Sequence, residues 1–293
     1  VISLLRNFGK RTSYLFYMAD NSKVGLVLEG GGMRGIFTAG FLDCLLDYGI
    51  NFPYIIGVSA GTTTGLSYLS KQKGRTRFSD TDLLKIYDYV GLRHFIAGHG
   101  IINLNYLFYE YPDRHFPFDF EEYRKSYCRF VMVATDAKTG EAAYFEERDN
   151  FDRFLLMSKA SCSMPYLCPK TEIDGRKYVD GGVADSLPFE RALHDGCEKV
   201  VVVMTKPEGF RRKERNMKWA KFLSPIMKRL LERNAEYNKQ LDSLAQLEQD
   251  GRAIVIRPST DYGVGRTTND TAKIELLYDE GYRKGQEYVA KNL

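Results

Sequence analysis

The stretch YIIGVSAGTTTGLSYLS at residues 54–70 decides the fold. Its apolar start predicts a buried strand, and the small residues and leucines that follow predict a helix from residue 60 to residue 70. The Gly57-Val58-Ser59-Ala60-Gly61 pattern lies where the strand and the helix meet. A serine on such a sharp turn projects its hydroxyl above the sheet, which makes Ser59 a candidate nucleophile. The alternative is that Ser59 only caps the helix N-terminus.

A glycine-rich loop precedes this segment. Val24 to Leu28 form a short apolar run that predicts a strand, which leads into Gly30-Gly31-Gly32-Met33-Arg34-Gly35 and a predicted helix. Such a loop can bind a dinucleotide, but that use requires an acidic residue at the end of the second strand, where this chain has Ser59. It can also direct unobstructed backbone N–H groups at a developing negative charge. We favour the second use, an oxyanion hole close to the serine.

An activated serine needs a base, and the sequence offers two. Asp180 follows a predicted strand and is held by Gly181 and Gly182, so its carboxylate could accept the serine proton directly. The Asp-Gly pair on its own is also a common turn signal. In the chain order serine, acid, histidine, only His194 lies beyond residue 115, but it falls in a predicted helix rather than on a loop.

The rest of the chain alternates strands and helices. Strands are predicted at residues 24–28, 54–58, 129–134, 142–145, 177–179, 199–204 and 253–257, and helices at 36–46, 60–70, 151–160, 188–194, 225–247 and 271–289. This series predicts a mostly parallel sheet between two helix layers, a three-layer α/β/α fold. We expect an N-terminal extension at residues 1–22, a catalytic domain at 23–205, and a basic, mainly helical C-terminal region at 206–293 that packs on the catalytic domain.

The glycine-rich, Gly-x-Ser-x-Gly and Asp-Gly-Gly motifs, in this order, resemble the patatin-like phospholipase family. The resemblance covers residues 24–205 and includes Ala-Ser-Cys-Ser-Met-Pro at 160–165, while Glu29 and Gly182 differ mildly from the residues common in the family. It implies a three-layer fold that hydrolyses lipid acyl esters with a serine–aspartate dyad. The reaction would pass through an acyl-enzyme and need no metal or cofactor.

The same resemblance assigns roles to residues. It makes Ser59 the nucleophile, Asp180 the general base and the backbone of Gly30 to Gly35 the oxyanion hole, with Arg34 at a basic position that orients the loop or meets a phosphate. The motifs are completed by Gly57, Val58, Ala60, Gly61, Gly181 and Gly182. The alternatives are a general carboxylesterase whose triad uses His194, and a non-catalytic, membrane-associated scaffold of the same fold.

The composition limits the class of protein. The 293 residues carry 42 Lys and Arg against 38 Asp and Glu, a net charge of +4, so we expect no nucleic-acid partner. No apolar run approaches the roughly 18 residues that a membrane-spanning helix needs. The five cysteines contain no CxxC pair, which argues against a zinc site or a disulfide framework and favours a cytoplasmic location.

Basic charge is concentrated between Lys206 and Arg233, a segment with ten basic residues and three acidic ones. With Trp219 and Phe222, this segment could dock on an anionic membrane surface, which would make the protein a peripheral membrane protein. The alternative, which we favour, is a solvated helix packed on the catalytic domain.

Two further segments carry expectations. Gly91 to Phe120 is rich in aromatic residues and could wall an acyl-chain pocket or form a lid, but we favour a core-packing insertion. Its His94 and His99 are five residues apart and do not share a helix face, so we expect no metal there. We also expect that Met18 is the physiological start and that the residues before it are poorly ordered.

Overall fold

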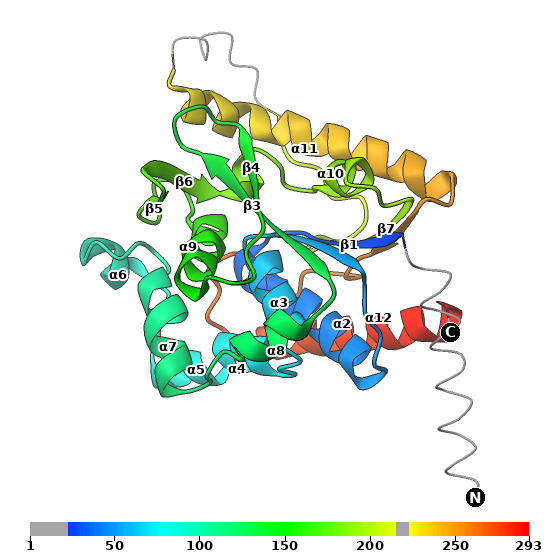
Figure 1. Cartoon of the computed structure of the whole chain (residues 1–293), viewed down its shortest axis with the longest axis horizontal. Coiled ribbons are helices and arrows are strands. Elements are labelled where there is room, and N and C mark those ends of the chain that lie inside the picture. Colours follow the sequence, from blue (N-terminus) through cyan, green and yellow to red (C-terminus); the bar gives the residue numbers. More distant parts are fainter. Residues whose placement is uncertain (1–22, 215–222, 293) are drawn as a thin grey trace, which may run out of the picture.

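The computed structural model describes residues 23–214 and 223–292 (Figure 1). The expectations about the N-terminal extension, Met18, Trp219 and Phe222 therefore fall outside the described residues. Among the helices of the described part, none combines the length and the apolar character that crossing a membrane requires.

An eight-stranded sheet forms the centre of the molecule. Its strands are β1 (Val24–Leu28), β2 (Tyr54–Val58), β3 (Arg129–Asp136), β4 (Ala142–Phe145), β5 (Thr171–Ile173), β6 (Arg176–Asp180), β7 (Lys199–Val203) and β8 (Ala253–Ile256). The order is β5-β6-β3-β2-β1-β7-β8, with β4 also paired to β3. The five neighbouring strands β3, β2, β1, β7 and β8 run parallel, and β4, β5 and β6 add an antiparallel edge. The predicted mostly parallel sheet is thus confirmed.

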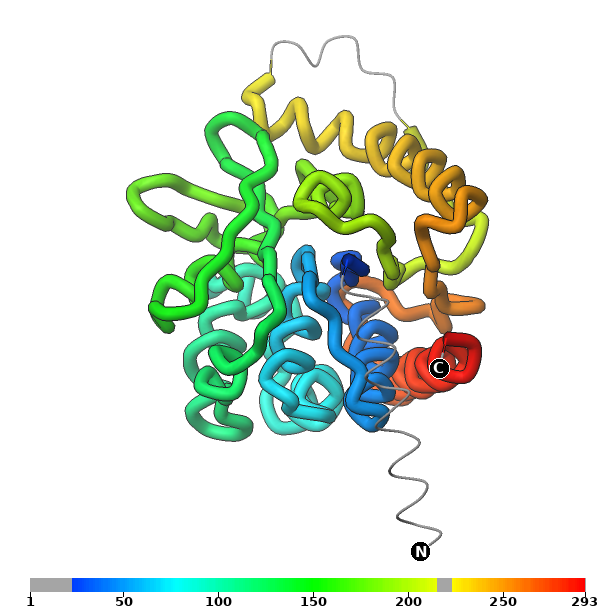
Figure 2. Tube along the Cα trace, turned by 45° about the vertical axis from the view of Figure 1, so that its right-hand side comes forward, coloured from blue at the N-terminus to red at the C-terminus, as the bar shows by residue number. Residues whose placement is uncertain are grey.

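Helices cover both faces of the sheet, as the three-layer prediction requires (Figures 1 and 2). One layer contains α2 (Ile36–Asp47), α3 (Ala60–Leu69), α9 (Phe151–Cys162) and α12 (Thr271–Asn292), and the other contains α10 (Phe189–His194) and α11 (Pro225–Gln249). Successive strand residues point to opposite faces. In β1, Leu26 and Leu28 therefore join the core beneath α2, whereas Val27 joins the core beneath α10 and α11.

The remaining helices are short. They are η1 (Gly32–Gly35), α4 (Arg75–Asp80), α5 (Asp82–Ile86), α6 (Leu92–Ile96), the π-helix η2 (Tyr106–Glu110), α7 (Tyr111–Arg114), α8 (Phe120–Lys125) and η3 (Gly181–Val183).

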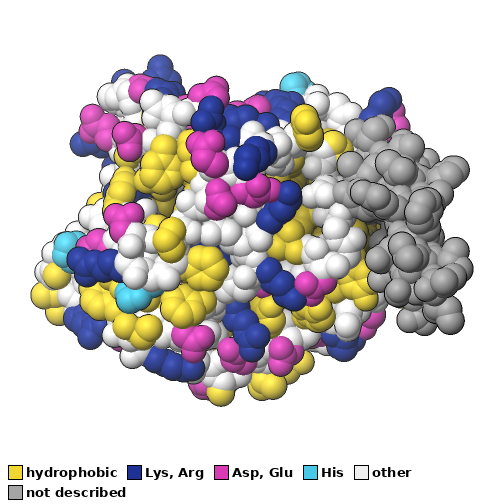
Figure 3. Space-filling model, turned by 60° about the horizontal axis from the view of Figure 1, so that its bottom comes forward, with side chains coloured by type: hydrophobic (Ala, Val, Ile, Leu, Met, Phe, Trp, Pro, Cys, Tyr) yellow, Lys and Arg dark blue, Asp and Glu magenta, His cyan; other side chains and the backbone are white. Residues whose placement is uncertain are grey.

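Figure 3 shows a face of the molecule on which basic and acidic side chains are interspersed and hydrophobic side chains lie exposed between them. No single sign of charge dominates that face.

The C-terminal region is part of the central architecture. Strand β8 extends the sheet beside β7, while α11 and α12 lie in opposite helix layers. Helix α12 crosses α2 at very close range, because a Cβ atom on Gly281 would lie 2.0 Å from the Phe37 carbonyl oxygen. Glycine is required at this crossing for lack of space. Residues 23–205 alone therefore lack one strand of the sheet and a helix of each layer.

Candidate functional site

The predicted strand, sharp turn and helix around Ser59 are present. Strand β2 ends at Val58, and α3 begins at Ala60, with Ser59 between them at φ 55° and ψ −121°. A non-glycine residue in this region is strained by about 1–3 kcal/mol, and such strain clusters at functional sites. The Ser59 side chain makes no capping hydrogen bond to the helix, so the interpretation of Ser59 as a simple N-cap is wrong.

The flanking glycines of the motif are needed for space. A Cβ atom on Gly61 would lie 2.3 Å from the Leu28 carbonyl oxygen, and one on Gly57 would lie 2.8 Å from the Gly61 carbonyl oxygen. The turn can therefore pack tightly against the end of β1. This packing brings the serine next to the glycine-rich loop that follows β1.

The glycine-rich loop lies directly beside Ser59, since a Cβ atom on Gly30 would be 3.0 Å from the Ser59 Cβ atom. Within the loop, the Met33 amide donates to the Arg266 carbonyl oxygen at 3.1 Å, and the Arg34 amide donates to Gly31 at 3.4 Å. The amides of Gly31 and Gly32 donate to no other residue of the described ranges. These two amides are thus free to serve an anion, and the Met33 amide is not.

Arg34 is buried within this loop region. Burial, followed by the charge of Arg266, lowers the pKa of its guanidinium. Its side chain lines neither of the two pockets that reach Ser59 in the described structure. Of its two predicted roles, this placement favours orientation of the loop over contact with a phosphate.

Asp180 is held rigidly at the end of β6. Its Oδ1 atom accepts a hydrogen bond from the Gly182 amide at 2.8 Å, and its own amide donates to the Ser163 carbonyl oxygen at 2.7 Å. The antiparallel pairing of β6 with β3 places Asp180 opposite Ala134, near the carboxyl end of the strand next to β2. Ser59 and Asp180 line the same pocket, although no hydrogen bond joins their side chains.

Helix α9 supports the turn from below. The Ser59 amide donates to the Ser161 Oγ atom at 2.9 Å, and that hydroxyl is 2.8 Å from the Thr62 Oγ1 atom. Burial and then the charge of Asp180 raise the pKa of the neighbouring Cys162 thiol. The segment at residues 160–165 thus holds the backbone of the turn, a function that its sequence alone did not reveal.

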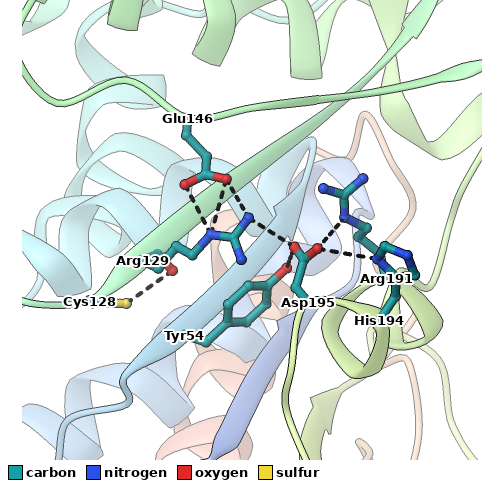
Figure 4. Close-up of polar contacts among 7 residues, drawn as sticks. All are labelled: Tyr54, Cys128, Arg129, Glu146, Arg191, His194 and Asp195. Atoms are coloured by element: carbon teal, nitrogen blue, oxygen red, sulfur yellow. Dashed lines mark hydrogen bonds and ion pairs between the residues drawn. The ribbon is translucent and has the colours of Figure 1, made fainter.

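His194 lies far from the serine, which removes the triad alternative. Its side chain is 83% exposed, and its Nδ1 atom is 3.6 Å from Asp195. Asp195 accepts a hydrogen bond from Tyr54 at 2.9 Å, as Figure 4 shows. Tyr54 is the first residue of β2, whereas Ser59 follows the last, so about 16 Å of strand separates the two ends.

An apolar pocket opens from Ser59 into the first helix layer. It encloses about 130 Å³, close to the roughly 150 Å³ of a dry cavity that binds benzene, so it accommodates a short apolar segment. Its apolar and aromatic lining comprises Met33, Ala60, Leu66, Tyr89, Ile102, Leu104, Leu107, Phe108, Tyr111, Pro112, Phe118, Phe154, Leu155, Cys162 and Met164. The aromatic segment from Gly91 to Phe120 therefore walls a pocket as well as packing into the core, so core packing alone was an incomplete interpretation.

A carboxyl group and a guanidinium group also line this pocket. Asp80 accepts hydrogen bonds from Ser79 and Tyr89, and burial raises its pKa to about 7. The Arg75 guanidinium lies over the rings of Tyr111 and Phe118, and burial lowers its pKa. No sequence motif pointed to either group.

A second pocket shares Gly32, Ser59 and Met164 with the apolar one. Its lining includes Asp180 together with the side chains of Arg212, Arg233 and Arg266. Two of these arginines belong to the basic segment from Lys206 to Arg233, whose charge was expected to face a membrane or solvent. The excess of basic residues is visible in the sequence, but it was not predicted that some of their side chains line a pocket beside Ser59.

The remaining polar clusters do not suggest a metal. Across residues 23–214 and 223–292, no group of three or more His, Cys, Asp or Glu side chains is arranged to hold an ion. The buried His94 instead lies 2.6 Å from the Asp88 carbonyl oxygen.

Fold and site together define an α/β protein with a serine on a strained strand-to-helix turn, next to a glycine-rich loop. The family model described as patatin-like phospholipase matches residues 26–193, and this chain belongs to that family. A second model, a domain of unknown function (DUF6363), matches residues 223–293.

Relatives include the uncharacterized protein YjjU of Escherichia coli K12, which is 28% identical over 66% of this chain and 57% of YjjU. The lysophospholipase nte1 of Aspergillus terreus is 25% identical over 92% of this chain. Among solved structures, VipD from Legionella pneumophila matches with a TM-score of 0.48 and 14% identity, over 92% of this chain and 67% of VipD. The chain spans about half of the length of YjjU and 18% of the nte1 protein.

Proposed function

We propose that this chain hydrolyses acyl esters of lipids with Ser59 as nucleophile and Asp180 as general base. The observation that carries the proposal is the position of Ser59, where an apolar pocket, the free Gly31 and Gly32 amides and a pocket containing Asp180 meet. Membership of the patatin-like phospholipase family and the name of the nte1 relatives support a lipid substrate.

The reaction begins when the Ser59 oxygen attacks the ester carbonyl carbon and Asp180 accepts the hydroxyl proton. The two side chains need to approach each other for this step. Catalytic hydrogen bonds are often long in the absence of substrate and tighten when it binds. The proton then passes to the leaving alcohol as the ester bond breaks, which leaves an acyl-enzyme.

The negative charge of the tetrahedral intermediate would be stabilised by the Gly31 and Gly32 amides. Loss of one such donor typically reduces turnover about 100-fold or more. Water then attacks the acyl-enzyme while Asp180 accepts a proton from it, and release of the fatty acid restores Ser59. No step uses His194.

Peripheral contact with lipid is also part of the proposal, but through an apolar surface. On α6, Leu92, Phe95 and Ile96 are exposed. The segment after α6 is hydrogen-bonded to Leu167, which lines the arginine-containing pocket. In contrast, Lys206 and Arg211 of the basic segment form ion pairs with acidic side chains of the protein. Co-sedimentation with neutral vesicles should weaken in an Ile96→Ser variant if α6 contacts lipid.

A fluorophosphonate probe tests the catalytic part of the proposal. The wild-type protein should be labelled and should hydrolyse p-nitrophenyl esters, and Ser59→Ala should lose both properties. Asp180→Asn should lose turnover while its circular dichroism spectrum stays that of the folded protein. His194→Ala is the matched control and should keep full activity. Absence of labelling in folded wild-type protein would instead favour the non-catalytic scaffold.

A further inference from the structure

The pocket that joins Asp180 to Ser59 is lined by three arginines from the C-terminal part of the chain. Arg233 lies on α11, Arg212 lies in the segment before it, and Arg266 lies in the loop before α12. Asp180 is the single carboxylate of this lining, so the charged groups of the pocket sum to +2. A fold-stabilising role alone does not explain three cations around one pocket.

The three guanidinium groups lack carboxylate partners. Within the described ranges, neither Arg233 nor Arg266 forms an ion pair, and the Arg233 Nε atom is buried without a hydrogen-bond partner. Arg212 is 3.3 Å from the Ser186 hydroxyl and lies 3.6 Å above the Tyr237 ring. In the described part of the chain, no ion pair thus neutralises any of the three positive charges, which favours the binding of an anion.

Glu29, a buried carboxylate outside this pocket lining, is already engaged. One of its oxygens accepts hydrogen bonds from the Thr205 amide and hydroxyl at 2.6 and 2.9 Å. The other accepts from the Tyr237 hydroxyl at 2.8 Å. Its charge helps to hold the arginines in place, but its oxygens are occupied by these donors.

The cluster is electrostatically unfavourable without an anion. Burial, and then the charges of Arg212 and Arg266, lower the pKa of Arg233 to about 9. Perturbed groups that converge on a pocket are typical of binding sites. Planar guanidinium groups bind phosphate oxygens through paired hydrogen bonds, which makes arginine well suited to recognise phosphate.

The same pocket places Arg233 near the residues that surround the reacting serine. The Arg233 Nη2 atom would be 3.3 Å from a Cβ atom on Gly182, whose amide binds Asp180. Gly32 and Ser59 belong to the same lining. An anion bound to Arg233 would therefore lie close to Gly182 and Asp180, and on the alcohol side of the ester if the acyl chain occupies the apolar pocket.

We infer that Arg212, Arg233 and Arg266 form a phosphate subsite that selects acyl esters whose alcohol part carries a phosphate group. This inference rests on the proposed function, because it assigns the second pocket to the leaving alcohol. A lysophospholipid with a terminal phosphate on its glycerol has the required arrangement. A monoacylglycerol with the same acyl chain lacks the anion and serves as the matched neutral substrate.

The test compares lauroyl lysophosphatidic acid with monolauroylglycerol as substrates. In the wild-type protein, kcat/KM should favour the phosphate-bearing ester. Arg233→Gln and Arg266→Gln should each lower that preference by about tenfold or more, as expected when a hydrogen bond to a charged group is lost. Arg266 is exposed, so its substitution should leave the fold intact even if Arg233→Gln does not fold. Arg211→Gln, whose side chain pairs with Asp242, is the control and should keep the wild-type preference.

The outcomes separate this inference from the proposed function. Equal hydrolysis of both esters, unchanged by either arginine substitution, would overturn the phosphate subsite and leave the hydrolase intact. Failure to hydrolyse either ester, together with no fluorophosphonate labelling, would overturn the proposed function. Inorganic phosphate is titrated into Ser59→Ala as a further probe. If Arg233→Gln abolishes phosphate binding but leaves the preference between esters unchanged, the site binds free phosphate and the substrate assignment is wrong.

Discussion

Removal of one hydroxyl, by Tyr237→Phe, tests how α11 is connected to the glycine-rich loop. The Tyr237 hydroxyl donates to the Glu29 carboxylate at 2.8 Å, and Glu29 immediately precedes the loop. Both residues are buried. A hydrogen bond to a charged acceptor contributes about 1.5–3 kcal/mol, and the phenylalanine ring keeps the packing and the contact with Arg212. The free energy of unfolding should therefore fall by about 1.5–3 kcal/mol.

Differential scanning calorimetry measures this change. For a protein of this size, each kcal/mol lowers Tm by about 2–4 °C, so Tm should fall by about 3–12 °C. Tyr48→Phe, which removes an exposed hydroxyl, is the control and should change Tm by less than about 1 °C. Turnover should also fall, because Glu29 is next to the loop that supplies the Gly31 and Gly32 amides. A Tm equal to that of the wild type would refute the assignment of a strong buried hydrogen bond to this pair.

Three further substitutions test the pockets and the helix crossing. The free energy of unfolding of the wild type should decrease as pH rises, because the folded protein keeps the Asp80 proton up to about pH 7 whereas the unfolded chain loses it near pH 4. This decrease reaches about 4 kcal/mol in urea unfolding, and Asp80→Asn should remove it. Gly281→Ala should lower the free energy of unfolding by about 1–3 kcal/mol, since its Cβ atom would lie 2.0 Å from the Phe37 carbonyl oxygen. Leu107→Trp should fill part of the apolar pocket and lower kcat/KM for p-nitrophenyl laurate relative to the acetate by about tenfold.

Each of these substitutions has a control at an exposed position. Asp82→Asn should keep the wild-type pH dependence of stability, and Gln286→Ala, on the same helix as Gly281, should change the free energy of unfolding by less than about 0.5 kcal/mol. Ile96→Trp should leave the preference between laurate and acetate unchanged. A pH dependence that survives in Asp80→Asn, a Gly281→Ala protein as stable as the wild type, or an unchanged laurate preference in Leu107→Trp would contradict the corresponding argument.

The turn around Ser59 could be predicted because local sequence controls it. An apolar strand, two glycines and small residues at the start of α3 follow one another along the chain. The structure adds that neither glycine has room for a Cβ atom. The same local control holds for Asp180, which follows a predicted strand and precedes Gly181 and Gly182. Strand β5, with only three residues, and the short helices between α3 and β3 have no comparable local pattern, because packing around the pocket determines them.

The position of His194 could have been deduced from strand direction. His194 ends α10 and precedes β7, so it lies near the beginnings of the parallel strands. In parallel α/β sheets, ligands bind outside the carboxyl ends of the strands, where Ser59 follows β2. Chain order alone kept the triad alternative open, and topology removes it.

The convergence of Arg212, Arg233 and Arg266 on one pocket could not be predicted from sequence patterns. Charged residues on a helix or in a loop normally face solvent, so periodicity gives no reason to place Arg233 or Arg266 at a shared pocket. The position of Arg266 depends on β8, which extends the sheet, and on α12, which packs against α2 through Gly281, because these elements flank the loop that carries Arg266 to the glycine-rich loop. The Arg266 carbonyl oxygen accepts the Met33 amide, so the same residue fixes the loop and lines the pocket. A fragment limited to residues 23–205 would lose both contributions, which makes the C-terminal region a component of the site.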